Sequence, residues 1–236
     1  MAGGMRKVAV LILGLFSVAP ALRGGGLKAG VARVDITPPP GLPMYGYASR
    51  TQPATGTLDA LYARVLVLEA GEQRWALVTL DLGRVFGPPA LARLRQSLKE
   101  SSGISFLLIT ASHTHAGPNL LDEYTSGQTP AWETTALERI AKAVAEAAGH
   151  MQEVRLGTGY GHVYIGYNRR HVNPDGTVTM MWQNPTRIPT APVDPRVSVP
   201  GWTQPTGSRW RFWSTTLATL WSSGRTTFAI PRIMSA

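Results

Sequence analysis

Hydrophobic residues alternate with polar ones, or form short β-branched runs, in several segments of the chain. Runs of this kind, bounded by Gly, Pro or Ser, are typical of β-strands. The predicted strands cover residues 28–36, 62–69, 75–82, 105–110 and a segment from 154 onward. Three prolines at 38–40 stop the first of them, because proline cannot donate to a sheet ladder. The second and third strands predict a hairpin.

Two other segments carry apolar residues at the spacing of one helical face. The first opens at Pro88 and ends before Gly103, and the second runs from about Ala131 to Ala148. The predicted apolar face of the second helix consists of Leu137, Ile140, Ala141, Val144 and Ala148. Strands that alternate with helices predict an α/β domain with mixed β-sheets flanked by helices. The Gly-, Pro- and Thr-rich segment 41–59 predicts a long functional loop.

The N-terminus has the pattern of a targeting sequence. Arg6 and Lys7 precede an apolar run from Val8 to Val18, and small residues follow at 19–21. This order predicts a signal peptide over residues 1–21, a flexible leader over 22–28, and a secreted or periplasmic protein. The alternative is an uncleaved anchor or a buried helix, although the run is short for a membrane span.

The net charge of +9 is concentrated at the two ends of the chain. Residues 1–34 and 196–236 each carry five Lys or Arg and no acid, whereas residues 35–195 are close to neutral. No basic stripe with interleaved aromatic residues crosses the body, so the sequence predicts no nucleic-acid partner. The absence of cysteine excludes disulfides and thiolate metal sites.

The strongest chemical signal is a pair of histidines after a buried strand. His113 and His115 follow the apolar run 105–110, and Gly117 and Pro118 come directly after them. Residues two apart on an extended backbone face the same side, so we expect both imidazoles at one sheet edge, where they suit a divalent metal such as zinc. The alternative is a hydrogen-bonded polar pair near the core. A metallo-β-lactamase type of site is excluded, because it requires an Asp and a His where this chain has Gly117 and Pro118.

Several motifs together resemble the neutral/alkaline, non-lysosomal ceramidase family over most of residues 29–199. The matching stretches are Gly30–Pro38, Met44–Ala48, Leu61–Arg64, Asp81–Gly83, Ser112–Pro118, Tyr167–Arg170 and Asp194–Val197. The His-Thr-His-x-Gly-Pro order within Ser112–Pro118 is the most specific of them. The resemblance implies part of an αββα-type catalytic domain and hydrolysis of the amide in N-acyl sphingoid lipids, with membrane-surface contact through that substrate.

The resemblance also implies roles for individual residues. His113 becomes a zinc ligand, and His115 becomes an active-site imidazole that orients substrate or stabilises the oxyanion. Arg169 becomes the cationic partner of His115, and Asn168 becomes a substrate-binding residue. Arg169 has an alternative interpretation as a solvated loop residue, and Asp81 is either a partner of the histidines or a turn residue.

Other polar and aromatic residues are interpreted as structural. Tyr45 and Tyr47 are expected to pack rather than to catalyse. His150, His162 and His171 have no partner pattern and are expected at ordinary surface positions.

The chain departs from the family pattern after Val199. No later segment matches those that supply the second His, the Glu and the Tyr of the family's zinc site, so one of the four ligands is expected here. We therefore expect an incomplete, inactive form of the enzyme. Two alternatives remain, namely a non-catalytic exported fragment and a metal-dependent esterase or amidase acting on another lipid-like substrate.

Residues 200–236 predict a tail unrelated to the family. They hold four of the seven tryptophans and no acid, and they show no hydrophobic periodicity. We hypothesise that this segment is translated in the wrong reading frame. Codons shifted by one base across residues 212–222 permit Leu-Val-Asn-Tyr-Ala-Cys-His-Pro-Val-Val, which resembles the family segment bearing the second zinc-binding His.

Overall fold

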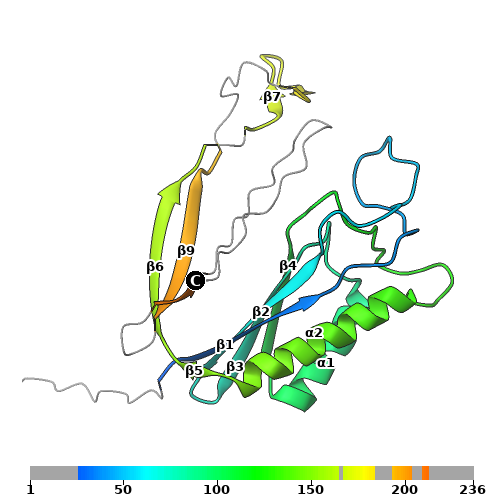
Figure 1. Cartoon of the computed structure of the whole chain (residues 1–236). Helices are drawn as coiled ribbons and strands as arrows, with labels where there is room; N and C mark the ends of the chain where they lie inside the picture. The colour runs from blue at the N-terminus through cyan, green and yellow to red at the C-terminus, as the bar shows by residue number, and fades with distance from the viewer. Residues whose placement is uncertain (1–25, 165–166, 184–192, 204–208, 213–236) are drawn as a thin grey trace, which may run out of the picture.

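The chain is built on a five-stranded sheet with the strand order β4-β3-β2-β1-β5 (Figure 1). The computed structural model describes residues 26–164, 167–183, 193–203 and 209–212. The elements of this sheet and its helices are β1 (Lys28–Asp35), β2 (Tyr62–Ala70), β3 (Gln73–Leu80), α1 (Pro88–Ser102), β4 (Phe106–Ala111), α2 (Ala131–Gly149) and β5 (Gln152–Glu153). The predicted α/β class, the hairpin and both helices are confirmed.

The register of the sheet decides which loops meet. β2 and β3 pair antiparallel around the turn at Gly71, whereas β3 and β4 pair parallel from Trp75↔Phe106 to Leu80↔Ala111. Helix α1 makes the crossover between these two parallel strands, as a parallel connection requires. The loops after β3 and β4 therefore leave the sheet at the same edge.

Both helices cover one face of the sheet, and the main hydrophobic core lies between the helices and that face (Figure 1). The predicted apolar face of α2 is partly corrected. Ile140 and Val144 are fully buried, but Leu137 is only partly buried, and the small residues on the adjacent stripe face the core instead. Small residues there let α2 approach β1 closely: a Cβ added to Gly30 would lie 1.9 Å from the carbonyl oxygen of Ala147.

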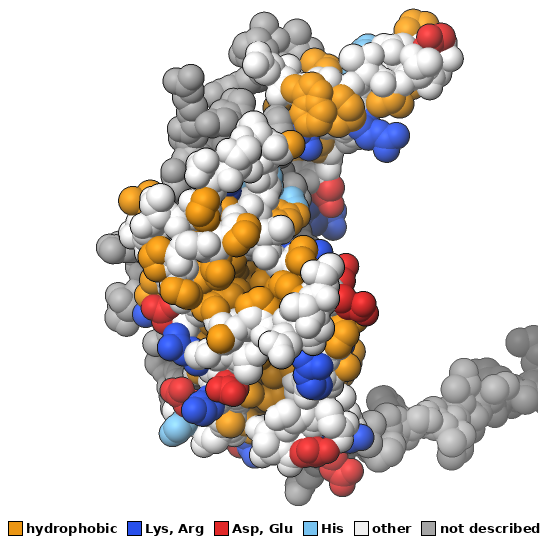
Figure 2. All heavy atoms as spheres, turned by 90° about the vertical axis from the view of Figure 1, so that its right-hand side faces the viewer, with side chains coloured by type: hydrophobic (Ala, Val, Ile, Leu, Met, Phe, Trp, Pro, Cys, Tyr) orange, Lys and Arg blue, Asp and Glu red, His pale blue; other side chains and the backbone are white. Residues whose placement is uncertain are grey.

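Within the part of the chain that the structure describes, little covers the opposite face of the sheet. At one end of this face, Val154 and Trp202 pack with Ala29 of β1 and Leu66 of β2 in a small buried cluster. At the β3–β4 end, the side chains of Trp75, Phe106 and Leu108 are 49%, 55% and 46% exposed. Figure 2 views the molecule from the right-hand side of Figure 1, where the 41–59 loop lies. Hydrophobic side chains gather over the middle of that side, with most of the Lys, Arg, Asp and Glu around them.

Two smaller strand groups follow the five-stranded sheet. Their strands are β6 (Arg155–His162), β7 (Arg170–Val172), β8 (Val178–Met180), β9 (Arg196–Thr203) and β10 (Arg209–Phe212). β6, β9 and β10 form one sheet, and β7 and β8 form a hairpin that Figure 1 draws apart from the rest. β9 continues across the predicted boundary at Pro200, because its ladder with β6 runs from Arg196 to Thr203.

Several predictions fall outside the described residues. These are the signal peptide at 1–21, most of the leader at 22–28, and residues 204–208 and 213–236 of the predicted tail. Among the helices of the described residues, none is long and apolar enough to cross a membrane.

Candidate functional site

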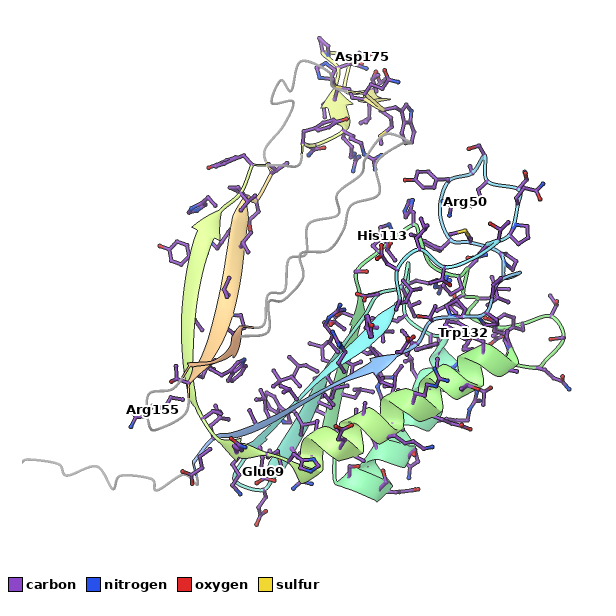
Figure 3. The ribbon with its side chains drawn as sticks, in the orientation of Figure 1. Arg50, Glu69, His113, Trp132, Arg155 and Asp175 are labelled. Atoms are coloured by element: carbon purple, nitrogen blue, oxygen red, sulfur yellow. The ribbon has the colours of Figure 1, made fainter. Side chains whose placement is uncertain are left out.

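The candidate site lies where β3 and β4 end, and it is built on the segment 112–118, here called the histidine turn. The backbone N–H of Ser112 donates to the carbonyl oxygen of Leu80 at 2.9 Å, which anchors the start of the turn to β3. His113 and His115 then leave the sheet together, with ring centroids 5.3 Å apart and an interplanar angle of 71°. Figure 3 shows His113 at this end of the sheet.

The expected backbone geometry of the two histidines is wrong, although their expected proximity is confirmed. β4 ends at Ala111, and His113 adopts a left-handed conformation with φ 59°, so the pair does not sit on extended backbone. A non-glycine residue in this conformation is uncommon and is found mostly in turns and at functional sites. The imidazoles meet because the chain turns at His113, not because side chains alternate along an extended strand.

A hydrogen bond fixes the tautomer of His113. Its Nδ1 lies 2.9 Å from the carbonyl oxygen of Gly83, in the loop after β3. A carbonyl oxygen only accepts, so Nδ1 carries the proton and donates it. Nε2 is then left with its lone pair, as in metal-binding histidines whose other nitrogen donates to a carbonyl.

The tyrosines of the 41–59 loop pack against the histidines. The ring of Tyr45 meets both His113 and His115 edge-on at 5.5 Å, and the ring of Tyr47 meets His115 at 4.8 Å. The backbone N–H of Tyr45 donates to the carbonyl oxygen of Gly117 at 2.9 Å. The prediction that these tyrosines pack is confirmed, and their partners are the candidate site itself.

Arg50 joins the same two segments and was not singled out from the sequence. Its Nη1 donates to the carbonyl oxygen of Tyr45 at 3.0 Å and to that of His115 at 2.7 Å. Its guanidinium also lies over the ring of Tyr47, 4.9 Å from the centroid. No local pattern could have identified it, because Arg50 and His115 are 65 positions apart in the sequence.

His115 lies in an environment that favours its neutral form. Partial burial is the main cause of its lowered pKa, and the electrostatic influence of His113 and of the Arg50 guanidinium lowers the pKa further. Gly46 allows the imidazole to come this close, since a Cβ at that position would lie 2.4 Å from the His115 ring. A neutral imidazole can offer either a donor or an acceptor to a bound molecule.

Asp81 stabilises the strand ends. Its carboxylate accepts from the backbone N–H of Tyr62 at 3.0 Å and pairs with the guanidinium of Arg64 at 2.7 Å. The structure favours the interpretation of Asp81 as a turn residue at the end of β3 over that of a partner of the histidines. Asp81 also comes just before the loop whose Gly83 carbonyl accepts the hydrogen bond from His113.

Asn168 and Arg169 lie at the foot of the β7–β8 hairpin. The Oδ1 of Asn168 accepts from the backbone N–H of Arg170 at 2.9 Å, and the Arg169 guanidinium lies 5.4 Å from the ring centroid of Trp182. Figure 3 draws this hairpin, with Asp175 at its tip, apart from the sheet end that carries His113. The expected pairing of Arg169 with His115 therefore stays a prediction.

Comparisons with known proteins establish the family of this chain. The family model described as neutral/alkaline non-lysosomal ceramidase, N-terminal, matches residues 27–173. The chain belongs to this family. The neutral ceramidase of Pseudomonas aeruginosa is 26% identical over an alignment of 185 residues that covers 73% of this chain and 27% of that protein.

Two solved ceramidase structures share the fold. The crystal structure of the neutral ceramidase from Pseudomonas aeruginosa has a TM-score of 0.59 at 22% identity, over 78% of this chain and 30% of that one. A ceramidase complexed with C2 has a TM-score of 0.62 at 22% identity, over 80% and 30%. This member of the ceramidase family thus spans about a quarter of the length of its curated relative.

Of the zinc ligands expected from the sequence, the described residues can supply one, His113. Nε2 of His113 has the lone pair and the fixed tautomer that a zinc ligand needs. Within the ranges that the structure describes, no group of three or more His, Cys, Asp or Glu side chains could hold a metal ion. A complete tetrahedral site therefore needs ligands from elsewhere.

Proposed function

We propose that this chain contributes part of the active site of a zinc-dependent hydrolase that cleaves the amide of N-acyl sphingoid lipids. Membership in the neutral/alkaline ceramidase family supports the substrate class. The observation that carries the proposal is the hydrogen bond from His113 Nδ1 to the Gly83 carbonyl, which prepares Nε2 as a ligand. A related ceramidase has been solved in complex with C2.

The residues divide the chemistry as follows. His113 would hold the metal through Nε2. A bound zinc ion would polarise the amide carbonyl and lower the pKa of its bound water to about 7. His115, neutral and held beside His113, would orient the substrate or donate a hydrogen bond to the oxyanion. Arg169 would add positive charge to that oxyanion, and Asn168 would contact the substrate. The lipid would bring this site to a membrane surface.

Histidine substitutions test this proposal. Zinc content and hydrolysis of a fluorescent N-acyl sphingosine are measured for the chain as it stands and for the chain continued in the shifted reading frame after residue 199. In the active form, His113→Ala removes both zinc and hydrolysis, whereas His115→Ala lowers the rate more than the zinc content. His150→Ala is the matched control, because His150 is exposed and caps the C-terminal end of α2, outside the histidine turn.

Each alternative function gives a different outcome. Cleavage of the matching ester but not of the amide would favour an esterase. No zinc and no turnover in either form would favour a non-catalytic fragment. Full zinc occupancy in His113→Ala would overturn the assignment of this ligand.

We also propose that the tail from about residue 200 is read in the wrong frame and that residues 1–21 direct export. The nucleotide sequence decides the first proposal. If the shifted frame has no His-Pro segment and no long open continuation, the proposal is contradicted. Mass spectrometry of the protein from its own host decides the second. Cleavage is expected after about Ala21, and an intact N-terminus on a cytoplasmic species contradicts export.

A further inference from the structure

The histidine turn is held by the 41–59 loop as well as by the sheet. The backbone of Asn119 donates to the carbonyl oxygen of Pro43 at 2.8 Å, and the backbone of Tyr45 donates to that of Gly117 at 2.9 Å. Arg50 adds side-chain hydrogen bonds to this backbone pairing. We infer that Arg50 is a positioning residue that fixes the relative orientation of the His113 and His115 imidazoles. Its value for catalysis rests on the proposed function, but its geometric role does not.

The backbone of this region needs an external restraint. Tyr47 and His113 both adopt left-handed conformations, with φ values of 53° and 59°. Residues other than glycine avoid this conformation, because the Cβ comes too close to the following carbonyl oxygen. Such conformations persist only where surrounding contacts over-determine them. The two strained residues lie on the two segments that Arg50 connects.

Arg50 is suited to supply that restraint. One nitrogen, Nη1, donates to the carbonyl oxygens of Tyr45 and His115, one from each segment. Its own backbone N–H donates to the carbonyl oxygen of Tyr47 at 2.9 Å, which closes the loop on itself. The planar guanidinium meanwhile lies over the Tyr47 ring. A lysine could keep the charge and donate hydrogen bonds, but its ammonium is not planar and cannot lie flat over the ring as a guanidinium does.

The hydrogen bonds of Arg50 act on the imidazoles through the backbone carbonyls and through the tyrosine rings. Arg50 donates directly to the carbonyl oxygen of His115. It also donates to the carbonyl oxygen of Tyr45, whose ring centroid lies 5.5 Å from those of both histidines. Removing the guanidinium should release the turn and let the two rings sample several orientations. The helix-covered core contains no part of this contact, so the fold should persist.

The test is NMR of the histidine side chains in the purified chain, and it needs neither zinc nor substrate. In the unsubstituted protein, His113 is expected in the single Nδ1–H tautomer. In Arg50→Ala the signals of His113 and His115 should shift and broaden, and the tautomer of His113 should become mixed. The signals of His150 should stay in place. Arg50→Lys should shift the same two signals by a smaller amount.

Arg33→Ala is the matched control. The Arg33 guanidinium also lies over a tyrosine ring, with its Cζ 4.5 Å from the centroid of Tyr62, but it contacts neither histidine. It should leave the ring signals of His113 and His115 unchanged. Ring signals identical to the unsubstituted protein in Arg50→Ala would overturn the inference. A uniform change at all histidines would overturn it as well, because Arg50 would then support the fold as a whole. If Arg50→Ala does not fold, Arg50→Lys carries the same comparison.

Discussion

The two faces of the five-stranded sheet differ in what covers them. On one face, α1 and α2 bury alternate strand residues such as Leu107 and Ile109. On the other, the neighbouring residues Phe106 and Leu108 of the same strand are about half exposed. Both sets are apolar, so hydrophobicity alone does not decide burial: the placement of the helices does. The comparison leads to four predictions.

The largest effect should come from the helix-covered face. Ile140→Ala removes a fully buried side chain from α2 and leaves a cavity, which costs about 2–5 kcal/mol of unfolding free energy. Chemical denaturation of the two proteins measures the difference. A loss below about 1 kcal/mol would mean that α2 does not close this core.

A close contact on the same face should be almost as sensitive. Gly30→Ala places a Cβ 1.9 Å from the carbonyl oxygen of Ala147 and must push α2 away from β1. Overpacking of this kind costs about 1–3 kcal/mol. Gly159→Ala is the matched control, since nothing lies within 4 Å of its added Cβ. Equal stability of the two variants would contradict the close packing of α2.

Glu133 extends the comparison to pH. This carboxyl is 1% exposed at the start of α2, and burial raises its pKa although Tyr124 donates a hydrogen bond to it at 2.6 Å. A folded-state pKa above the unfolded value means that the folded protein binds more protons in that interval. Stability should therefore fall as the pH rises from the ordinary glutamate pKa through the raised one.

Denaturation curves recorded across that pH interval test this effect. Glu133→Gln should remove the fall and be the more stable protein at the upper end of the interval. Tyr124→Phe should extend the fall to higher pH and make it larger in total, because the hydrogen bond that lowers the pKa of Glu133 is lost. A pH dependence that is unchanged in Glu133→Gln would assign the effect to another group.

The smallest effect should come from the open face. Phe106→Ser removes a side chain that is 55% exposed and has an edge contact with Trp75, so the loss of stability should stay within about 1 kcal/mol. Leu107→Ser, one residue along the same strand, faces the helices and should cost several times more in the same denaturation assay. Similar losses in the two variants would show that the open face is as well packed as the covered one.

The sequence was sufficient for the elements and for the position of the histidine motif. Alternating and helical spacing are local properties, so the strands, the hairpin and the helices of residues 28–149 could be predicted from them. The set of α2 residues that faces the core could not be predicted in full. Its small residues face inward where β1 approaches the helix closely, and that approach is a tertiary contact. For the candidate site, the pairing of His113 and His115 was predicted correctly but their backbone was not.

By itself, then, the sequence determined where the strands and helices lie, and which two imidazoles meet at the end of β4. Only the tertiary structure decided the left-handed turn at His113, the tautomer set by the Gly83 carbonyl, and the contact of Arg50 with His115. The physical reason is the range of the interactions. Helix and strand patterns depend on neighbours a few residues apart, whereas these contacts join segments that only the parallel pairing of β3 and β4 and the folded 41–59 loop bring together.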